Sequence, residues 1–227
     1  MSNRGRPRTF DRDLALQRGM EVFWAKGYEG AQLVDLTTAM GINPPSFYAA
    51  FGSKEEVFRE SVDHYRATIA SGVIRALQEG QTAGAAISAM LMKSIEVALT
   101  GPSGGCLLIL GLVDCIAENK PLRDYLKGIR RTSVMLIRQR LDRGVAEGDL
   151  PQDTDTQALA TYYHTVVQGL SLQARDGGSR RDLYTAMTLA LKALPGSPIG
   201  AKTGRAGAEP TGSPRAARSR RAKVTAR

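Results

Sequence analysis

Apolar residues recur at helical spacing along almost the whole chain, and this periodicity constrains the fold more than any other feature. Valine, isoleucine and threonine never alternate with polar residues over the length of a strand. The sequence therefore predicts an all-α protein. We expect about nine helices, near residues 10–27, 32–40, 45–51, 54–77, 82–100, 106–118, 121–147, 155–175 and 180–194.

Turn and cap residues separate these segments. Gly27 is expected to end the first helix, because glycine adopts the left-handed cap conformation without steric cost. Ser53, three residues before Glu56, fits a capping box that would begin the fourth helix. The run 101–105 has the glycine and proline content of a turn. Pro195 would stop the last helix.

The charge is concentrated at the two ends of the chain. The net charge of the 227 residues is +9, and residues 195–227 contain eight bases and one acid, so that segment contributes +7 and the remainder +2. The segment 195–227 has almost nothing to bury and is predicted to be a disordered basic tail. Basic ends on a nearly neutral body indicate a polyanionic partner, nucleic acid before membrane. No apolar run reaches the ~18 residues of a membrane span, so we expect a cytoplasmic protein with no membrane partner.

Residues 28–58 have the pattern of a helix-turn-helix. A short helix with Leu33, Leu36 and Met40 on its inner face is followed by Gly41 and a second short helix. Phe47 and Phe51, four residues apart, can hold that second helix against the first helix of the chain. Two helices joined by such a turn place the second one in the major groove of DNA.

At these residues the sequence resembles the tetracycline-repressor (TetR/AcrR) family of bacterial regulators. The resemblance lies in Phe23 with Gly27-Tyr28, in Leu36 with Gly41-Ile42, and in the run Phe47-Tyr48, Phe51 and Lys54-Glu55. It covers residues 10–60 well, and the remainder matches as a helical half of the expected length. It implies a DNA-binding domain over residues 1–53 and an effector-binding and dimerisation domain over residues 54–194.

The resemblance also assigns roles to individual residues in DNA binding. Tyr48 and Lys54 would contact phosphates, Asn43 would cap the recognition helix or touch a phosphate, and the arginines near the N-terminus would enter the minor groove. The implied DNA-binding residues are Arg4, Arg6, Arg8, Gln32, Asn43, Pro44, Pro45, Ser46, Tyr48, Ala49 and Lys54. Alternatively, Tyr48 could pack on the first helix, Lys54 could be solvated, and the arginines could form an idle tail.

Two departures from the family pattern affect how DNA would be read. Relatives commonly carry Thr or Ser where this chain has Ala31 and Gln32. The hydroxyl of such a residue would cap the second helix and contact the DNA backbone, and this chain has no hydroxyl there. No Arg or Lys lies between Asn43 and Phe51, so bidentate arginine–guanine contacts cannot come from this helix. Specificity would use Ser46, methyl contacts from Ala49 and Ala50, or DNA shape.

Two later helices carry apolar stripes suited to a homodimer. The stripes could form a four-helix bundle about a two-fold axis, or they could simply close the core of one subunit. The expected interface residues are Leu159, Tyr163, Val166, Gly169, Leu170, Leu183, Met187 and Ala190. A dimer would read a palindromic operator with half-sites about one helical turn apart.

A small-molecule effector would bind among the helices between residues 54 and 147. The expected lining residues are Tyr65, Ile69, Met90, Ile95, Cys106, Leu110, Val113 and Met135, although residues of these types more often belong to a core than to a ligand site. Their composition favours a mostly apolar ligand. Effector binding would tilt the helix that starts at Lys54 and separate the two recognition helices.

The remaining polar residues point to no enzyme, cofactor or metal. Cys106 and Cys115 lie nine residues apart on one expected helix, ~13 Å, too far for a disulfide. Cys106 lies near a helix start, where the dipole would lower its pKa, so it is the better candidate for a thiol sensor. His64 and His164 lack metal-ligand spacing. We therefore expect a sequence-specific transcription regulator, a repressor released by its effector. A nucleoid-type DNA-binding protein, an activator, and a helical enzyme or carrier are the alternatives.

Overall fold

The computed structural model describes residues 10–113 and 115–196, and within those ranges it contains ten α-helices, one 3-10 helix and no strand. The all-α prediction is confirmed. Arg4, Arg6, Arg8 and the basic tail beyond Gly196 lie outside the described residues. The helices are α1 Arg12–Gly30, α2 Leu33–Met40, α3 Pro44–Phe51, α4 Lys54–Thr68, α5 Ser71–Glu79, α6 Ala83–Thr100, α7 Leu107–Leu110, η1 Ala117–Asn119, α8 Lys120–Ala146, α9 Thr156–Arg175 and α10 Arg180–Leu191.

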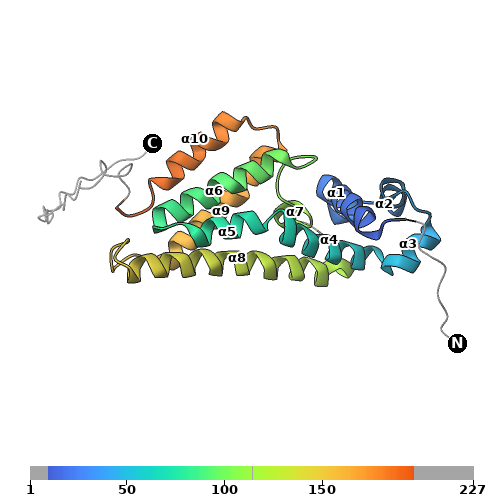
Figure 1. Cartoon of the computed structure of the whole chain (residues 1–227), viewed down its shortest axis with the longest axis horizontal. Coiled ribbons are helices and arrows are strands. Elements are labelled where there is room, and N and C mark those ends of the chain that lie inside the picture. Colours follow the sequence, from blue (N-terminus) through green and yellow to red (C-terminus); the bar gives the residue numbers. More distant parts are fainter. Residues whose placement is uncertain (1–9, 114, 197–227) are drawn as a thin grey trace, which may run out of the picture.

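The helices are arranged along one long axis (Figure 1). The small helices α1, α2 and α3 form one end of the molecule. The 27-residue α8 runs along the larger part, with α5, α6 and α9 beside it and α10 on the outside. α4 leads from the small end into the larger part and packs against α1.

Side-chain caps begin several helices, as short-range sequence signals predict. Asp11 accepts hydrogen bonds from the N–H groups of Asp13 and Leu14 at the start of α1. The Ser53 hydroxyl accepts the Glu56 N–H at 3.1 Å at the start of α4. These caps satisfy N–H groups that have no partner within the helix.

Two predicted helices differ from the structure. The segment predicted as one helix over 54–77 is divided into α4 and α5. The N–H groups of Ile69 and Ala70 both donate to the Tyr65 carbonyl, and the Ser71 hydroxyl donates to the Thr68 carbonyl, so the regular helical pattern of hydrogen bonds is interrupted there. The segment predicted as a helix over 106–118 keeps only the four residues of α7. The carbonyl of Gly111 instead accepts the Tyr28 N–H at 2.7 Å, a tertiary bond.

Two clusters of buried apolar residues hold the helices together. The first joins α1–α4 to α7 and to the beginning of α8, through residues such as Phe23, Phe58 and Leu126. This core therefore continues past residue 53, where the sequence suggested a domain boundary. The second joins α5, α6, α8, α9 and α10. α6 is long and apolar enough to cross a membrane by composition alone. Its buried residues belong to the two cores, Val97 to the first and most of the others to the second, as expected for a core helix.

Candidate DNA-binding surface and effector cavity

α2 and α3 are joined by a tight turn at Gly41. Gly41 has φ 69°, a left-handed conformation that glycine adopts without the cost of a side chain. The Ile42 N–H donates to the Thr37 carbonyl at 3.1 Å and closes the turn. The Asn43 side chain then caps α3 by accepting the Ser46 N–H at 2.9 Å. This geometry is a helix-turn-helix with α3 as its second helix.

The two faces of α3 have opposite environments. Phe47 and Phe51 are buried, as the sequence predicted, and hold α3 on the rest of the small domain. Tyr48 is 52% exposed and packs edge-on against Phe47, so its side chain is not buried on α1. Pro44, Pro45 and Ala49 are also exposed, and Ser46 is half-buried. The outer face of α3 is therefore uncharged and projects one phenol group.

Gln32 and Lys54 occupy different surroundings. Gln32 precedes α2 and is exposed, and its N–H donates to the Asp35 carboxylate at 3.0 Å. Asp35 also binds Lys26, and the hydrogen bond from Lys26 lowers the pKa of Asp35. The ammonium group of Lys54 lies 4.4 Å from the centre of the Tyr28 ring, and burial lowers its pKa. Lys54 is thus half-buried over an aromatic face rather than fully solvated.

Arg12 positions α3, a role that the sequence did not reveal. Its guanidinium donates to the Ala50 carbonyl at 3.3 Å, pairs with Glu60 at 2.8 Å and lies 4.5 Å from the centre of the Phe51 ring. One side chain of α1 therefore contacts both α3 and α4. The contacts join residues 38 and 48 positions apart, so no local pattern could have indicated them.

The small domain is attached to the larger one at the end of α1. Gly27 has φ 68° and interrupts the helix, which is the break that the sequence predicted there. Because the Tyr28 N–H donates to Gly111, the Trp24 carbonyl is left to accept from the Arg175 guanidinium at 2.7 Å. Arg175 also donates to the carbonyls of Gly104 and Ala25, at 3.0 and 3.3 Å.

Trp24 completes this joint from the other side. Its indole N–H donates to the Gly105 carbonyl at 3.1 Å. Its ring meets the Tyr65 ring edge-on, with centroids 4.9 Å apart. We name the contacts of Trp24, Ala25 and Tyr28 with Gly104, Gly105, Gly111 and Arg175 the interdomain joint.

A cavity of about 110 Å³ lies immediately behind this joint. Tyr65 and Cys106 line it, so the cavity is adjacent to Trp24 and Gly105. Most of its surface is aliphatic, and its polar groups include Arg130 from α8 and His164 from α9. The full lining is Tyr65, Ala70, Val73, Ile74, Leu77, Met90, Ser94, Val97, Cys106, Leu108, Ile109, Arg130, Ser133, Leu136, Ile137, His164, Val167 and Ser171.

The structure brings together three of the eight residues expected in the cavity, namely Tyr65, Met90 and Cys106. The other five expected residues do not line it. Ile95 is buried in the second core, and Ile69 packs against the first. Val113 and Met135 are exposed and Leu110 is half-buried. The sequence did not single out Arg130, because an arginine on a long helix is usually a surface residue.

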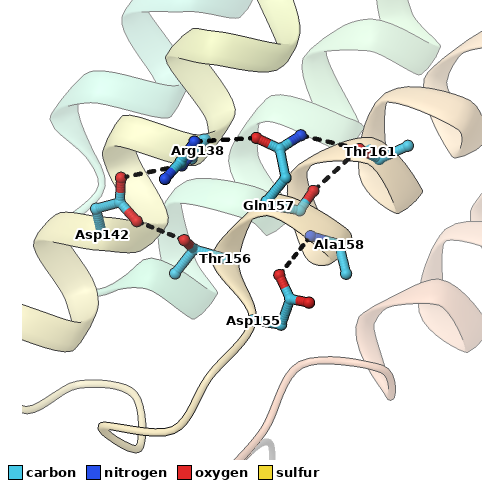
Figure 2. A network of polar contacts seen from close by, with 7 residues as sticks. All are labelled: Arg138, Asp142, Asp155, Thr156, Gln157, Ala158 and Thr161. Carbon is cyan, nitrogen blue, oxygen red and sulfur yellow. Dashed lines mark hydrogen bonds and ion pairs between the residues drawn. The ribbon is translucent and has the colours of Figure 1, made fainter.

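A polar network connects α9 to α8 (Figure 2). Arg138 pairs with Asp142 at 3.6 Å and donates to the Gln157 side chain at 3.2 Å. The Thr156 hydroxyl donates to Asp142 at 2.5 Å. Asp155 caps α9 through the Ala158 N–H. The network joins the C-terminal part of α8 to the first turn of α9.

Cys106 differs electrostatically from the sequence-based expectation. It was expected to gain acidity from a helix N-terminus, but α7 has only four residues. Burial instead raises the pKa of the Cys106 thiol, and a hydrogen bond from the Tyr65 hydroxyl at 3.3 Å opposes this shift. Burial also raises the pKa of Tyr65. The prediction of a lowered thiol pKa was wrong, and a protonated thiol is a weak nucleophile.

The expected interface residues of α9 and α10 divide into buried and exposed positions. Tyr163, Leu170, Leu183, Met187 and Ala190 are buried within the subunit. Their side chains therefore close the subunit core. Leu159 and Val166 are half-buried and Gly169 is exposed. The exposed surface of the same helices includes Tyr162, Thr165, Leu172, Ala186 and Leu189.

The fold and site define a class of protein: a helical DNA-binding regulator with an N-terminal helix-turn-helix and a cavity-bearing helical domain. Comparison with known proteins gives the family. Residues 15–61 match the profile described as bacterial regulatory proteins, tetR family, and residues 85–190 match that of the tetracyclin repressor-like C-terminal domain. The chain belongs to the TetR family, and it is a sequence-specific DNA-binding transcription regulator.

Individual relatives agree with this assignment. The HTH-type transcriptional repressor ComR of Escherichia coli K12 is 30% identical over 195 residues, 85% of this chain and 93% of ComR. The repressor BdcR of the same organism is 28% identical over 84% of this chain and 92% of BdcR. A solved structure of a cysteine mutant of the TetR-family regulator CifR, complexed with 26-base-pair operator DNA, is 45% identical. The match covers 84% of this chain and 100% of the CifR chain, with a TM-score of 0.81.

Proposed function

We propose that this protein is a homodimeric repressor that binds a palindromic operator through α2 and α3 and leaves it when a small molecule enters the cavity. The observation that carries the proposal is the position of the cavity directly behind the joint between the two domains, where Tyr65 touches Trp24. Similarity to two repressors supports the direction of regulation. We infer a regulator acting in the cytoplasm on chromosomal DNA rather than an enzyme.

The DNA-facing surface would be the exposed side of α3. Tyr48 is free to donate its hydroxyl to a phosphate, and Ser46, Ala49 and the two prolines would face base edges. Because this face carries no cation, base recognition would depend on methyl contacts and on DNA shape. The N-terminal arginines would add minor-groove contacts.

The homodimer would use the exposed side of α9 and α10 rather than the side first predicted. Residues 156–174 contain no Asp, Glu, Lys or Arg, although four of their positions at helical spacing are exposed: Tyr162, Thr165, Gly169 and Leu172. On α10, Ala186 and Leu189 continue the uncharged surface. Depletion of charge is the compositional sign of an interface core. A two-fold axis along this face would give two recognition helices for one operator.

The effector would act through the interdomain joint. A ligand in the cavity, against Tyr65 and Cys106, would press on the ring that contacts Trp24 and on the segment around Gly105 that accepts the Trp24 indole N–H. It must bind the non-operator arrangement more tightly to shift the population. The cavity would thus be coupled to the DNA-binding domain through α1 as well as through α4.

Selection of bound duplexes from a random pool, with the full-length protein at physiological salt, tests the DNA function. Enrichment of a palindrome with half-sites about 34–36 Å apart is expected. Enrichment without a motif, lost as salt rises, would favour the nucleoid alternative. Sedimentation of the protein alone tests the dimer, with Leu189→Glu expected to yield monomers and Thr188→Glu as the control on the same helix. A monomeric wild-type protein at micromolar concentration would contradict the interface.

A further inference from the structure

Arg130 is a cation without a carboxylate partner at the wall of a mostly apolar cavity. Its guanidinium donates to the Leu108 carbonyl at 2.9 Å. In the part of the chain that the structure describes, none of the ion pairs includes Arg130. The lining residues include no Asp or Glu. Arg140, a neighbour on α8, also binds a backbone carbonyl, that of Gly80, but it does not line the cavity.

The uncompensated charge affects its surroundings. Burial lowers the pKa of Arg130, although a guanidinium remains charged at neutral pH. The pKa of His164, on the facing helix, is lowered first by burial and then by the charge of Arg130. The lining of the cavity therefore contains a guanidinium and no carboxylate. Moving a charge away from water is costly unless it is paired, so an anionic group bound here would remove part of that cost.

The remainder of the cavity sets the body of such a ligand. Its volume of about 110 Å³ is somewhat below the ~150 Å³ of an engineered apolar cavity that binds benzene. The aliphatic lining comes from α5, α6 and α8, with residues Val73, Leu77, Met90, Leu136 and Ile137. The body of the ligand can therefore be no larger than one aromatic ring or a short alkyl chain unless the helices move.

We propose that the effector is a small monocarboxylic acid whose carboxylate binds Arg130 and whose aromatic or short alkyl body fills the apolar part of the cavity. The proposal rests on the proposed function and specifies its ligand. Of the three serine hydroxyls that line the cavity, those of Ser94 and Ser133 already donate to backbone carbonyls, and that of Ser171 accepts the Cys106 N–H. The Ser171 hydroxyl could add one neutral donor, but a guanidinium offers several charged N–H donors, so Arg130 is the lining group best able to orient an anion.

Binding at Arg130 would also reach the interdomain joint. A carboxylate that takes the Arg130 N–H groups competes with the Leu108 carbonyl, which lies in α7. Three residues further along the chain, Gly111 accepts the Tyr28 N–H from the end of α1. Releasing α7 from Arg130 would loosen this attachment of the DNA-binding domain. The segment from Leu108 to Gly111 would thus take part both in ligand recognition and in the attachment of the DNA-binding domain.

Calorimetric titration of the full-length protein at neutral pH tests the ligand class. The probes are benzoate and hexanoate, each beside its neutral amide, benzamide and hexanamide. A charged hydrogen bond contributes ~1.5–3 kcal/mol, so we expect each acid to bind about tenfold or more tightly than its amide. Equal or tighter binding of the amides, or no binding of any probe, would overturn the proposal.

Variants assign the preference to one side chain. Arg130→Gln should reduce acid binding to the level of the amide, whereas Arg131→Gln, an exposed neighbour on α8, should leave the preference intact. If Arg130→Gln does not fold, the acid–amide comparison in the wild-type protein decides the question alone. Operator binding by the acid-free protein is measured separately. Its absence would contradict the proposed function, whereas its presence without an acid preference contradicts only the ligand class.

Discussion

Replacing Arg175 by methionine should weaken the attachment of the two domains to each other, and so lower the free energy of unfolding, without disturbing either core. The guanidinium makes three hydrogen bonds, at 2.7, 3.0 and 3.3 Å, to carbonyls of Trp24, Gly104 and Ala25. Methionine retains much of the aliphatic length but none of the donors. Two of the carbonyls belong to the end of α1, where a cation also interacts favourably with the helix dipole.

The size of the effect follows from these bonds. A hydrogen bond to a charged group contributes ~1.5–3 kcal/mol, and the two shorter bonds dominate. Because Arg175 is only half-buried, water can solvate the released carbonyls in part, and we expect a loss of about 2–3 kcal/mol in the free energy of unfolding. For a chain of this size that corresponds to a decrease of ~4–12 °C in Tm.

Thermal unfolding by circular dichroism measures this change, together with operator affinity by fluorescence anisotropy. Arg181→Met, at an exposed position of α10, is the matched control. Arg175→Lys should recover only part of the loss, because a single ammonium cannot reproduce the planar fork. A Tm for Arg175→Met within about 1 °C of the control would refute the claim that this side chain holds the joint.

Three further outcomes are expected. Tyr48→Phe should weaken operator binding about threefold to tenfold, as loss of one phosphate hydrogen bond does, and should leave the Tm unchanged because the side chain is exposed. Undiminished affinity in anisotropy titrations would exclude that contact. Deleting residues 195–227, which removes a net charge of +7, should flatten the slope of log affinity against log salt concentration, because fewer counterions are released. An unchanged slope would show that the tail does not contribute to DNA binding. The pKa of His164 is lowered in the fold, so the unfolded chain binds the proton more readily and this contribution to stability is lost as pH falls below ~6.5. His164→Asn should therefore reduce the loss of stability between pH 7.5 and 5.5 in urea titrations, and an undiminished loss would contradict this role of His164.

The acidity of Cys106 illustrates why a local argument can give the wrong sign. The position after two glycines at a helix start suggested a stabilised thiolate. In the structure, the tertiary packing of Tyr65 and the wall of the cavity removes the thiol from water. Desolvation of the charged form then outweighs the short helix.

The sequence by itself determined the features that depend on neighbours a few residues apart. Helical spacing predicted the all-α class, and Asn43, Ser53 and the φ-permissive Gly41 defined the helix-turn-helix and its caps. The four-residue spacing of Phe47 and Phe51 also predicted which face of α3 is buried. These features follow from hydrogen bonds and side-chain contacts within one or two helical turns.

Only the tertiary structure decided how distant segments share their polar groups. Arg175 meets Trp24 across 151 positions, and Tyr28 takes the Gly111 carbonyl that the predicted helix over 106–118 would have used. The cavity gathers Arg130 and His164 from two helices, and the same packing buries Tyr163 and Leu170, which were predicted at a dimer interface, within the subunit core. Such contacts depend on which helix faces lie together, and a helical period alone gives the faces of each helix but not their partners.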